Sequence, residues 1–211
     1  GYDLQRILEQ VYLGADGIYG TPLWVSATFV IVIVVLGALL ERSGASGVLM
    51  DIALATTKNS RGGPAKAAVV GSSLMGMISG TAVANVLTTG TISIPLMRRA
   101  GYKPSVAAGV EAVASTGGQL MPPIMGAAAF LMADIMEVPY LEITAAALIP
   151  AVLFYIAVFA TVHLEAVKTG LKPLDSLEVP NVSQSLLRSG HVLLSIPVFI
   201  GALVSGYSVM Y

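Results

Sequence analysis

The sequence GGQLMPPIMG, at Gly117–Gly126, lies inside a run of uncharged residues from Ala112 to Ala133. Such a run is long enough to cross a bilayer as a helix. It nevertheless places two adjacent glycines and two adjacent prolines near its middle, and both residue types interrupt helices. Non-helical backbone at membrane depth is tolerated only where it is buried in protein or lines a watery cavity. We therefore expect residues 98–136 to form a discontinuous transmembrane helix with a functional break.

The composition is that of an integral membrane protein. Of the 211 residues, 55% are hydrophobic and 11% are charged, whereas soluble domains carry about 25% charged residues. The mean hydropathy is +0.82. The net charge of −1 gives no basic field for nucleic acid, and the lack of cysteine excludes disulfides and thiolate metal sites. We expect an all-α, polytopic membrane protein that needs no cofactor.

Periodicity and charge divide most of the chain into segments. The spacing of apolar residues predicts an amphipathic interfacial helix over 1–16, then a first span and a cytoplasmic surface helix over 17–66. A further transmembrane helix is expected over 137–164, a cytoplasmic connector over 165–190, and the start of another span over 191–211. Lys and Arg fall almost wholly on the side that this topology places inside. Because the last segment is still apolar where the sequence stops, we expect a fragment of a longer polypeptide.

The segment Ala67–Met97 predicts a re-entrant hairpin. Its thirty-one residues carry no charge, and one helix of that length would measure about 46 Å against a hydrocarbon core of about 30 Å. Its middle reads ISGTAVAN, which is small and polar, with Gly80 placed to break a helix. Basic residues flank both ends and favour the same, cytoplasmic side. We therefore expect residues 67–97 to enter the membrane, turn near residues 79–82 and return.

Together the two breaks predict a cation site. Unwound carbonyls in transporters coordinate Na⁺, while the N-termini of half-helices present N–H groups to anions. Glycines at 117 and 118 would leave carbonyls accessible, and prolines at 122 and 123 remove N–H donors. Side-chain oxygens near the breaks belong to Ser79, Thr81, Asn85, Thr88, Thr89, Thr91, Ser115, Thr116 and Gln119.

Several of these residues also have a purely structural interpretation. Ser72, Ser73 and Ser93 are more typical of helix packing, and GMISG at Gly76–Gly80 matches a GxxxG contact. Taken singly, Thr88 and Thr89 would satisfy their own backbone, and His163 and His191 would be interfacial. Only the two breaks considered together favour function over packing.

Glu111 allows two interpretations. It is the one acid in the segment 104–133 before the break. An intramembrane carboxylate usually faces a cavity and has a function, but this one could also lie near the cytoplasmic interface, close to Lys103.

The sequence allows two other functions. GASG at Gly44–Gly47 matches the G-x-S-G of intramembrane serine proteases, with Ser46 as nucleophile and His191 as base, but this serine falls in a predicted surface loop. The chain could also be a non-transporting scaffold that anchors partner subunits. A permease with functional breaks is the leading hypothesis, and it is not an enzyme.

Three longer stretches resemble a known family. These are ISGTAVANVLTTGTISIPLMRRAGYKP at 78–104, EAVASTGGQLMPPIMGAAAFLMAD at 111–134 and VPYLE at 138–142. They resemble the large membrane subunit of tripartite ATP-independent periplasmic (TRAP) transporters, and most closely the branch that works with TAXI-type binding proteins. The resemblance extends from about Leu8 to Lys172.

The resemblance implies a transport function and partners. The fold would be one inverted repeat of an elevator transporter of the ion-transporter superfamily, driven by Na⁺ and importing organic acids. A TAXI-type periplasmic substrate-binding protein would deliver the substrate. A small membrane subunit, which can be fused upstream, would be the second partner, and the location would be a bacterial or archaeal inner membrane. The family has two such repeats and this chain shows one, so it would supply half of a substrate site.

The resemblance also assigns roles to residues at the breaks. Combined with the oxygens described above, the expected Na⁺ site consists of Ser79, Gly80, Thr81, Asn85, Gly117, Gly118 and Pro123, mostly through backbone carbonyls. The expected substrate region consists of Thr88, Thr89, Ser115, Thr116 and Gln119.

Overall fold

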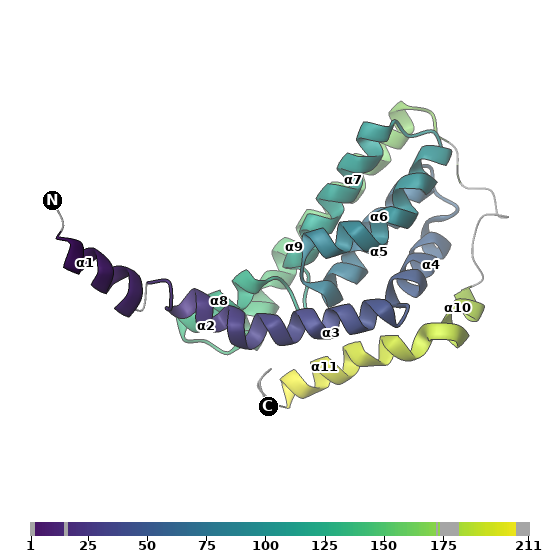
Figure 1. Cartoon of the computed structure of the whole chain (residues 1–211). Helices are drawn as coiled ribbons and strands as arrows, with labels where there is room; N and C mark the ends of the chain where they lie inside the picture. Colours follow the sequence, from purple (N-terminus) through teal and green to yellow (C-terminus); the bar gives the residue numbers. More distant parts are fainter. Residues whose placement is uncertain (1–2, 15–16, 172, 174–181, 206–211) are drawn as a thin grey trace.

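The computed structural model describes residues 3–14, 17–171, 173 and 182–205, and in this part of the chain all regular structure is helical (Figure 1). The helices are α1 (Leu4–Leu8), α2 (Thr21–Val25), α3 (Ile31–Arg42), α4 (Ala45–Thr57), α5 (Gly63–Ser79), α6 (Ala82–Arg99), α7 (Pro104–Gly117), α8 (Ala127–Met136), α9 (Tyr140–Lys168), α10 (Val182–Ser189) and α11 (Ser195–Val204). Helices α4 to α7 and α9 form the central bundle, and α3 and α11 run along its lower side in Figure 1.

Two helical stretches of the described chain are long and apolar enough to cross a membrane. The first, Thr21–Arg42, joins α2 and α3 through a wider π-helical turn, and the second is α9. Their outer faces carry exposed aliphatic side chains such as Val32 and Leu153, which suit a lipid environment. Helix α9 continues to Lys168, so the predicted connector that starts at residue 165 begins too early.

Helices α5 and α6 form an antiparallel pair with a very short connection, and we call these two helices the hairpin pair. Helix α5 ends at Gly80, which has a left-handed φ of 62°, and α6 starts after the extended residue Thr81. The chain thus turns within the segment 79–82 that the sequence marked. At 17 and 18 residues the two helices measure about 26 Å each, which is shorter than a bilayer core. Their placement in a membrane stays a prediction.

The helix broken at GGQLMPPIMG consists of α7 and α8. After α7 a single 3₁₀ turn covers Gly118–Leu120, and the chain is then non-helical until α8 begins at Ala127. The Pro122–Pro123 peptide bond is cis, and Met125 has a positive φ of 61°. The interruption therefore covers most of the quoted decapeptide.

Helix α4 differs from its prediction as a surface helix. It packs along α5 and buries Val48, Leu49 and Met50. On its other side lies α10, whose Ser185 hydroxyl donates to the carboxylate of Asp51. Asp51 thus faces a neighbouring helix. Of the predicted connector, residues 174–181 lie outside the described part, as do residues 1–2, 15–16 and 206–211 of the predicted terminal segments.

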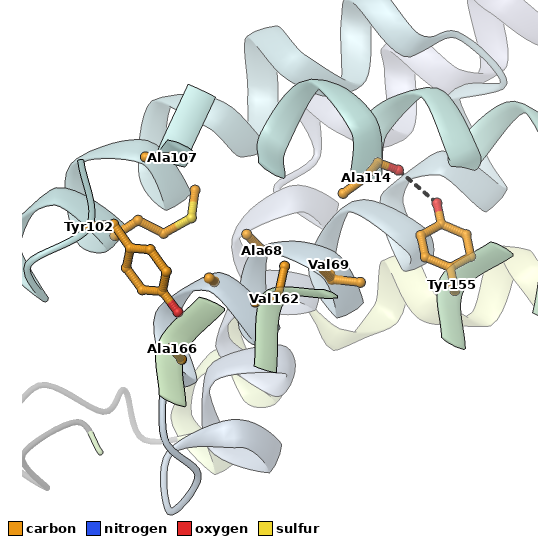
Figure 2. Packing of buried hydrophobic residues seen from close by; sticks show 10 residues of the cluster. Ala68, Val69, Tyr102, Ala107, Ala114, Tyr155, Val162 and Ala166 are labelled. Carbon is orange, nitrogen blue, oxygen red and sulfur yellow. Dashed lines mark hydrogen bonds between the residues drawn. The ribbon is translucent and has the colours of Figure 1, made fainter. Parts of the chain in front are cut away.

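The core of the bundle is built largely from alanines. Five buried alanines on α5, α7 and α9 let these helices approach closely, and two tyrosines fill the remaining space (Figure 2). Tyr155 donates to the carbonyl of Ala114 on α7 (2.8 Å). Burial, assisted by the charge of Glu165, raises the pKa of Tyr102 to about 12. The Tyr102 hydroxyl donates to the Gly62 carbonyl. This core fixes α7 and α9 against the hairpin pair.

Candidate ion-binding region at the two helix breaks

The two breaks in the sequence touch each other in the structure. A Cβ atom added to Gly80 would lie 2.4 Å from the carbonyl oxygen of Met125, and one added to Gly126 would lie 3.5 Å from the carbonyl oxygen of Gly80. Only glycine combines the left-handed backbone of position 80 with so close an approach. The α5–α6 turn is therefore fitted against the non-helical segment between α7 and α8.

A cavity of about 190 Å³ lies at this contact, and we call it the tip cavity. Its polar lining comes from both breaks and includes no charged side chain. The residues are Ser79, Gly80, Thr81, Gln119 and Met125. Its apolar wall consists of Val30, Ile33, Val34, Ala127 and Phe130. The oxygens available are hydroxyls, an amide and backbone carbonyls. In the described chain no group of three His, Asp or Glu side chains could hold a metal ion, so any cation here would depend on neutral oxygens.

Met125 gives the tip cavity a strained wall. Its φ of 61° is unusual for a residue with a side chain and costs about 1–2 kcal/mol. The N–H of the next residue, Gly126, donates to the Gln119 carbonyl at 2.8 Å and holds the segment in place. Strain of this kind is found where the surrounding structure enforces a functional conformation. Sequence reasoning did not single out Met125.

Gly117 and Gly118 have a packing reason to be glycine. A Cβ on Gly118 would lie 2.7 Å from the Cα of Gly76, and a Cβ on Gly76 would lie 2.3 Å from the Cα of Gly118. At Gly117 the obstacle is Phe154, whose ring would lie 2.2 Å away. The sequence suggested that these glycines expose carbonyls for a ligand. In the structure the backbone of Gly118 packs against the backbone of Gly76. Gly76 and Gly80, the two glycines of the GxxxG motif, both face the break.

Tyr140 contacts two backbone carbonyls of the non-helical segment. Its hydroxyl, on the first residue of α9, lies 3.1 Å from the Pro123 carbonyl oxygen and is also hydrogen-bonded to the Ile124 carbonyl. Pro123 thus lies in a different environment from the tip cavity. Tyr140 was not predicted, and a tyrosine after Pro139 gives little signal in sequence, because its partners are sixteen and seventeen residues away.

Asn85 connects the two legs of the hairpin pair. It is fully buried, and its amide group donates to the carbonyl of Ser72 on α5 at 2.8 Å. The amide nitrogen would also lie 3.2 Å from a Cβ on Gly118, so Asn85 rests on the break. Of the expected Na⁺ ligands, Ser79, Gly80 and Thr81 therefore share one cavity, Asn85 and Gly118 form a second contact, and Pro123 is separate.

Glu111 is buried between helices. Its side chain is 0% exposed and lies among four hydroxyl groups from three helices. These are Ser72 of α5, Thr89 and Ser93 of α6, and Ser115 of α7. We call Glu111 and these residues the hydroxyl cluster. From the sequence, Ser72 and Ser93 were assigned to packing and Thr89 and Ser115 to the substrate region. That all four contact Glu111 was not predicted.

The remaining candidates bond to their own helices or lie elsewhere. Thr88 donates to Ala84 or Asn85, and Thr116 donates to Ala112, as threonines in helices commonly do. Gln119 is exposed and lines the tip cavity. His163 lines a separate apolar pocket between α5 and α9.

Comparison with known proteins identifies the family. The sequence model of the "Tripartite ATP-independent periplasmic transporter, DctM component" matches residues 2–210. This chain belongs to the DctM family. One relative is the "C4-dicarboxylate TRAP transporter large permease protein DctM" of Pseudomonas aeruginosa, 29% identical over 170 residues, which cover 81% of this chain and 39% of that protein. Another is the "2,3-diketo-L-gulonate TRAP transporter large permease protein YiaN" of Escherichia coli, 26% identical over 124 residues, which cover 58% of this chain and 27% of that protein.

Membership of the DctM family confirms the large-permease assignment and places the chain among transport components rather than enzymes. Family membership therefore contradicts the protease hypothesis. Ser46 lies in the first turn of α4, and the side chain of His191 is outside the described part of the structure. The DctM-family chain spans about two fifths of the length of its Pseudomonas relative.

Proposed function

We propose that this chain is one inverted repeat of the permease subunit of a Na⁺-coupled, binding-protein-dependent secondary transporter that imports organic acids by an elevator mechanism. The observation that carries the proposal is the contact between the two breaks, Gly80 against Met125, around the tip cavity. Paired helix interruptions that meet in this way are typical of ion and substrate sites in secondary transporters. In this proposal α5 and α6 form the re-entrant hairpin, and α7 and α8 form the discontinuous transmembrane helix.

The residues present fit Na⁺. The tip cavity offers the hydroxyls of Ser79 and Thr81, the amide oxygen of Gln119 and the carbonyl of Met125, and hard cations prefer such oxygens. When bound, Na⁺ would supply the positive charge that stabilises carbonyls turned away from helical hydrogen bonding. Asn85 and the glycine pair 76 and 118 would act indirectly, because they hold the two breaks at a fixed separation.

The substrate would bind where two helix N-termini lie close together. Helix α6 begins directly after Thr81 and α8 begins at Ala127, and both of these residues line the tip cavity. The free N–H groups of a helix N-terminus favour anions, which suits an organic acid. The two relatives named above carry C4-dicarboxylate and 2,3-diketo-L-gulonate in their names, and both are carboxylates. Thr88, Thr116 and Gln119 are the expected substrate residues whose side chains are not fully buried.

The complete transporter requires partners. We propose a periplasmic substrate-binding protein of the TAXI type, a small membrane subunit, and a second repeat of the permease that completes the substrate site. The location would be the inner membrane of a bacterium or archaeon. Support comes from family membership and from the three stretches that resemble the family, and the TAXI type rests on that resemblance alone.

The decisive experiment is uptake by the complete permease with its binding protein in proteoliposomes, with and without an inward Na⁺ gradient. Gly80→Ala would disrupt the tip cavity, and Gly109→Ala is the matched control, since nothing lies within 4 Å of a Cβ at position 109. We expect Na⁺-driven uptake in the wild type and the control, and at least a tenfold loss in Gly80→Ala. Uptake that does not respond to Na⁺ would refute the coupling, and no uptake by any protein would favour a scaffold.

A further inference from the structure

Glu111 lies where α5, α6 and α7 meet, and the structure makes room for it. Its Oε1 atom lies 3.1 Å from the hydroxyl of Ser72, 2.5 Å from that of Thr89 and 3.0 Å from that of Ser115, while Oε2 lies 2.5 Å from the hydroxyl of Ser93. A Cβ on Gly90 would lie 3.2 Å from the Cγ of Glu111, so a glycine on α6 leaves space for this side chain. The hydroxyl cluster is therefore a built site without solvent access.

No described basic side chain pairs with Glu111. On α5 the nearest cation in sequence is Lys66, whose ammonium lies over the ring of Phe159 instead. Arg98 and Arg99 are at the far end of α6 and exposed, and Lys103 precedes α7 and is exposed. On α9 the titratable side chain beside this region, Tyr155, donates to the Ala114 carbonyl. A carboxylate without a counter-charge in such a place is costly, and neutralisation is the usual way to avoid the cost.

The hydrogens in the cluster can be counted. Glu111 makes four contacts to hydroxyls. Thr89 makes three more, to the backbone carbonyl of Asn85 (2.7 Å), to the hydroxyl of Ser72 (3.2 Å) and to the side-chain oxygen of Asn85 (3.4 Å). Two oxygens that lie 2.5 Å or 2.7 Å apart, as in the contacts of Thr89 with Glu111 and with the Asn85 carbonyl, require a hydrogen between them. Four hydroxyls supply four hydrogens. If Glu111 were ionised, the single hydroxyl hydrogen of Thr89 could lie in only one of its two shortest contacts. The other contact would then contain no hydrogen.

A proton on Glu111 removes this shortage. The acid then donates from Oε1 to Thr89, and the Thr89 hydroxyl donates to the Asn85 carbonyl, while the other three hydroxyls still donate to the acid. Only the two longest contacts, those of Thr89 with the Ser72 hydroxyl and with the Asn85 side-chain oxygen, are left without a hydrogen. The distances of the cluster thus fit a neutral carboxylic acid better than a carboxylate.

We propose that Glu111 is a proton-binding site of the permease, occupied when α7 is packed against α5 and α6 as in this structure. On release the O–H bond of the acid breaks, the proton passes to water, and the carboxylate that remains lacks one hydrogen donor. Water can supply both the acceptor and the missing donor, but it reaches the buried cluster only if α7 separates from the hairpin pair. Proton exchange at Glu111 is therefore linked to that separation. The proposal does not depend on Na⁺ binding at the tip cavity.

Infrared spectroscopy of the complete permease in lipid tests the protonation directly. A protonated carboxylic acid has a carbonyl stretching band that is separate from the carboxylate and amide bands and shifts in D₂O. We expect such a band at neutral pH in the wild type and its loss in Glu111→Gln, which keeps the shape of the neutral acid. Glu142→Gln is the control, because Glu142 is an exposed acid of α9 and its replacement should leave the band unchanged.

Thermal unfolding provides a second readout that needs no transport. If Glu111 is neutral, Glu111→Gln keeps an oxygen acceptor and an N–H donor and should unfold within about 2–3 °C of the wild type. A wild type without the protonated-acid band at neutral pH would overturn the proposal. A band that persists in Glu111→Gln would do the same, because it would belong to another residue. Neither result would affect Na⁺-driven uptake, so this proposal and the proposed function can fail separately.

Discussion

The tip cavity and the hydroxyl cluster are both formed by the hairpin pair and the broken helix, yet they are constructed differently. The tip cavity is lined by backbone and by neutral side chains around open space. In the hydroxyl cluster every polar atom has a partner, and the carboxyl group at its centre is fully buried. A region of the first kind already has space for a ligand, whereas one of the second kind is closed until its helices move. The comparison predicts that mutations will affect stability mainly in the cluster and transport mainly in the cavity.

The largest loss of stability is expected for Glu111→Ala. The substitution leaves a cavity and removes the shared partner of Ser72, Ser93 and Ser115, at a cost of about 3–4 kcal/mol. Denaturation of the purified permease in detergent, compared with the exposed control Glu142→Ala, measures it. A cost below about 1 kcal/mol would contradict the conclusion that the hydroxyl cluster is closely packed while the tip cavity is open.

A smaller loss is expected for Gly118→Ala, in the contact that joins the two regions. The added methyl group would meet the backbone of Gly76 at 2.7 Å, and because backbone cannot rotate away, the helices must separate at a cost of about 2–3 kcal/mol. Gly109→Ala, on the exposed side of α7 with nothing within 4 Å, should be neutral or stabilise by about 0.5–1 kcal/mol. Equal effects of the two substitutions on the unfolding midpoint would exclude the close helix contact as the reason for glycine at 118.

The sequence predicted the breaks better than it predicted what surrounds them. Charge-free length and the glycines and prolines indicated both interruptions, because they act through local backbone chemistry. The family followed from the same motifs. That the breaks would meet through Gly80 and Met125 could not be derived, since this depends on how the helices pack.

The hydroxyl cluster shows most clearly why side-chain partners are hard to predict. Ser72 and Glu111 are 39 residues apart, and Ser93 and Glu111 are 18 apart. Each serine alone is typical of helix packing, which is how the sequence was interpreted. Only their common orientation toward one carboxyl group distinguishes them, and that orientation is a property of three packed helices. The same holds for Tyr140 and the carbonyl of Pro123.

An intermediate effect is expected for Tyr140→Phe, whose ring stacks on Phe130 of the tip-cavity wall. The ring would keep its stacking on Phe130, whose centroid lies 4.3 Å away, but the carbonyls of Pro123 and Ile124 would lose their donor at a cost of about 1–1.5 kcal/mol. Tyr12→Phe, an exposed tyrosine of the N-terminal segment, is the control. If Tyr140 holds the break in place, the mutant should also need more Na⁺ for half-maximal uptake. An unchanged Na⁺ requirement would limit its role to stability.

The smallest effect on stability is expected for Thr88→Val, one residue before the cluster. Its hydroxyl donates only within its own helix, so the change should cost less than about 0.5 kcal/mol. Thr89→Val should cost about 1–2 kcal/mol, because Thr89 bonds both Glu111 and the Asn85 carbonyl in the buried cluster. Two neighbouring threonines would thus differ in their effect on stability, because only Thr89 belongs to the hydroxyl cluster. If Thr88 also contacts the substrate, as its place in the expected substrate region predicts, Thr88→Val should raise the KM for uptake several-fold with stability unchanged. An unaltered KM would remove Thr88 from the substrate site and leave the tip cavity, with Gln119, as the place where the organic acid binds.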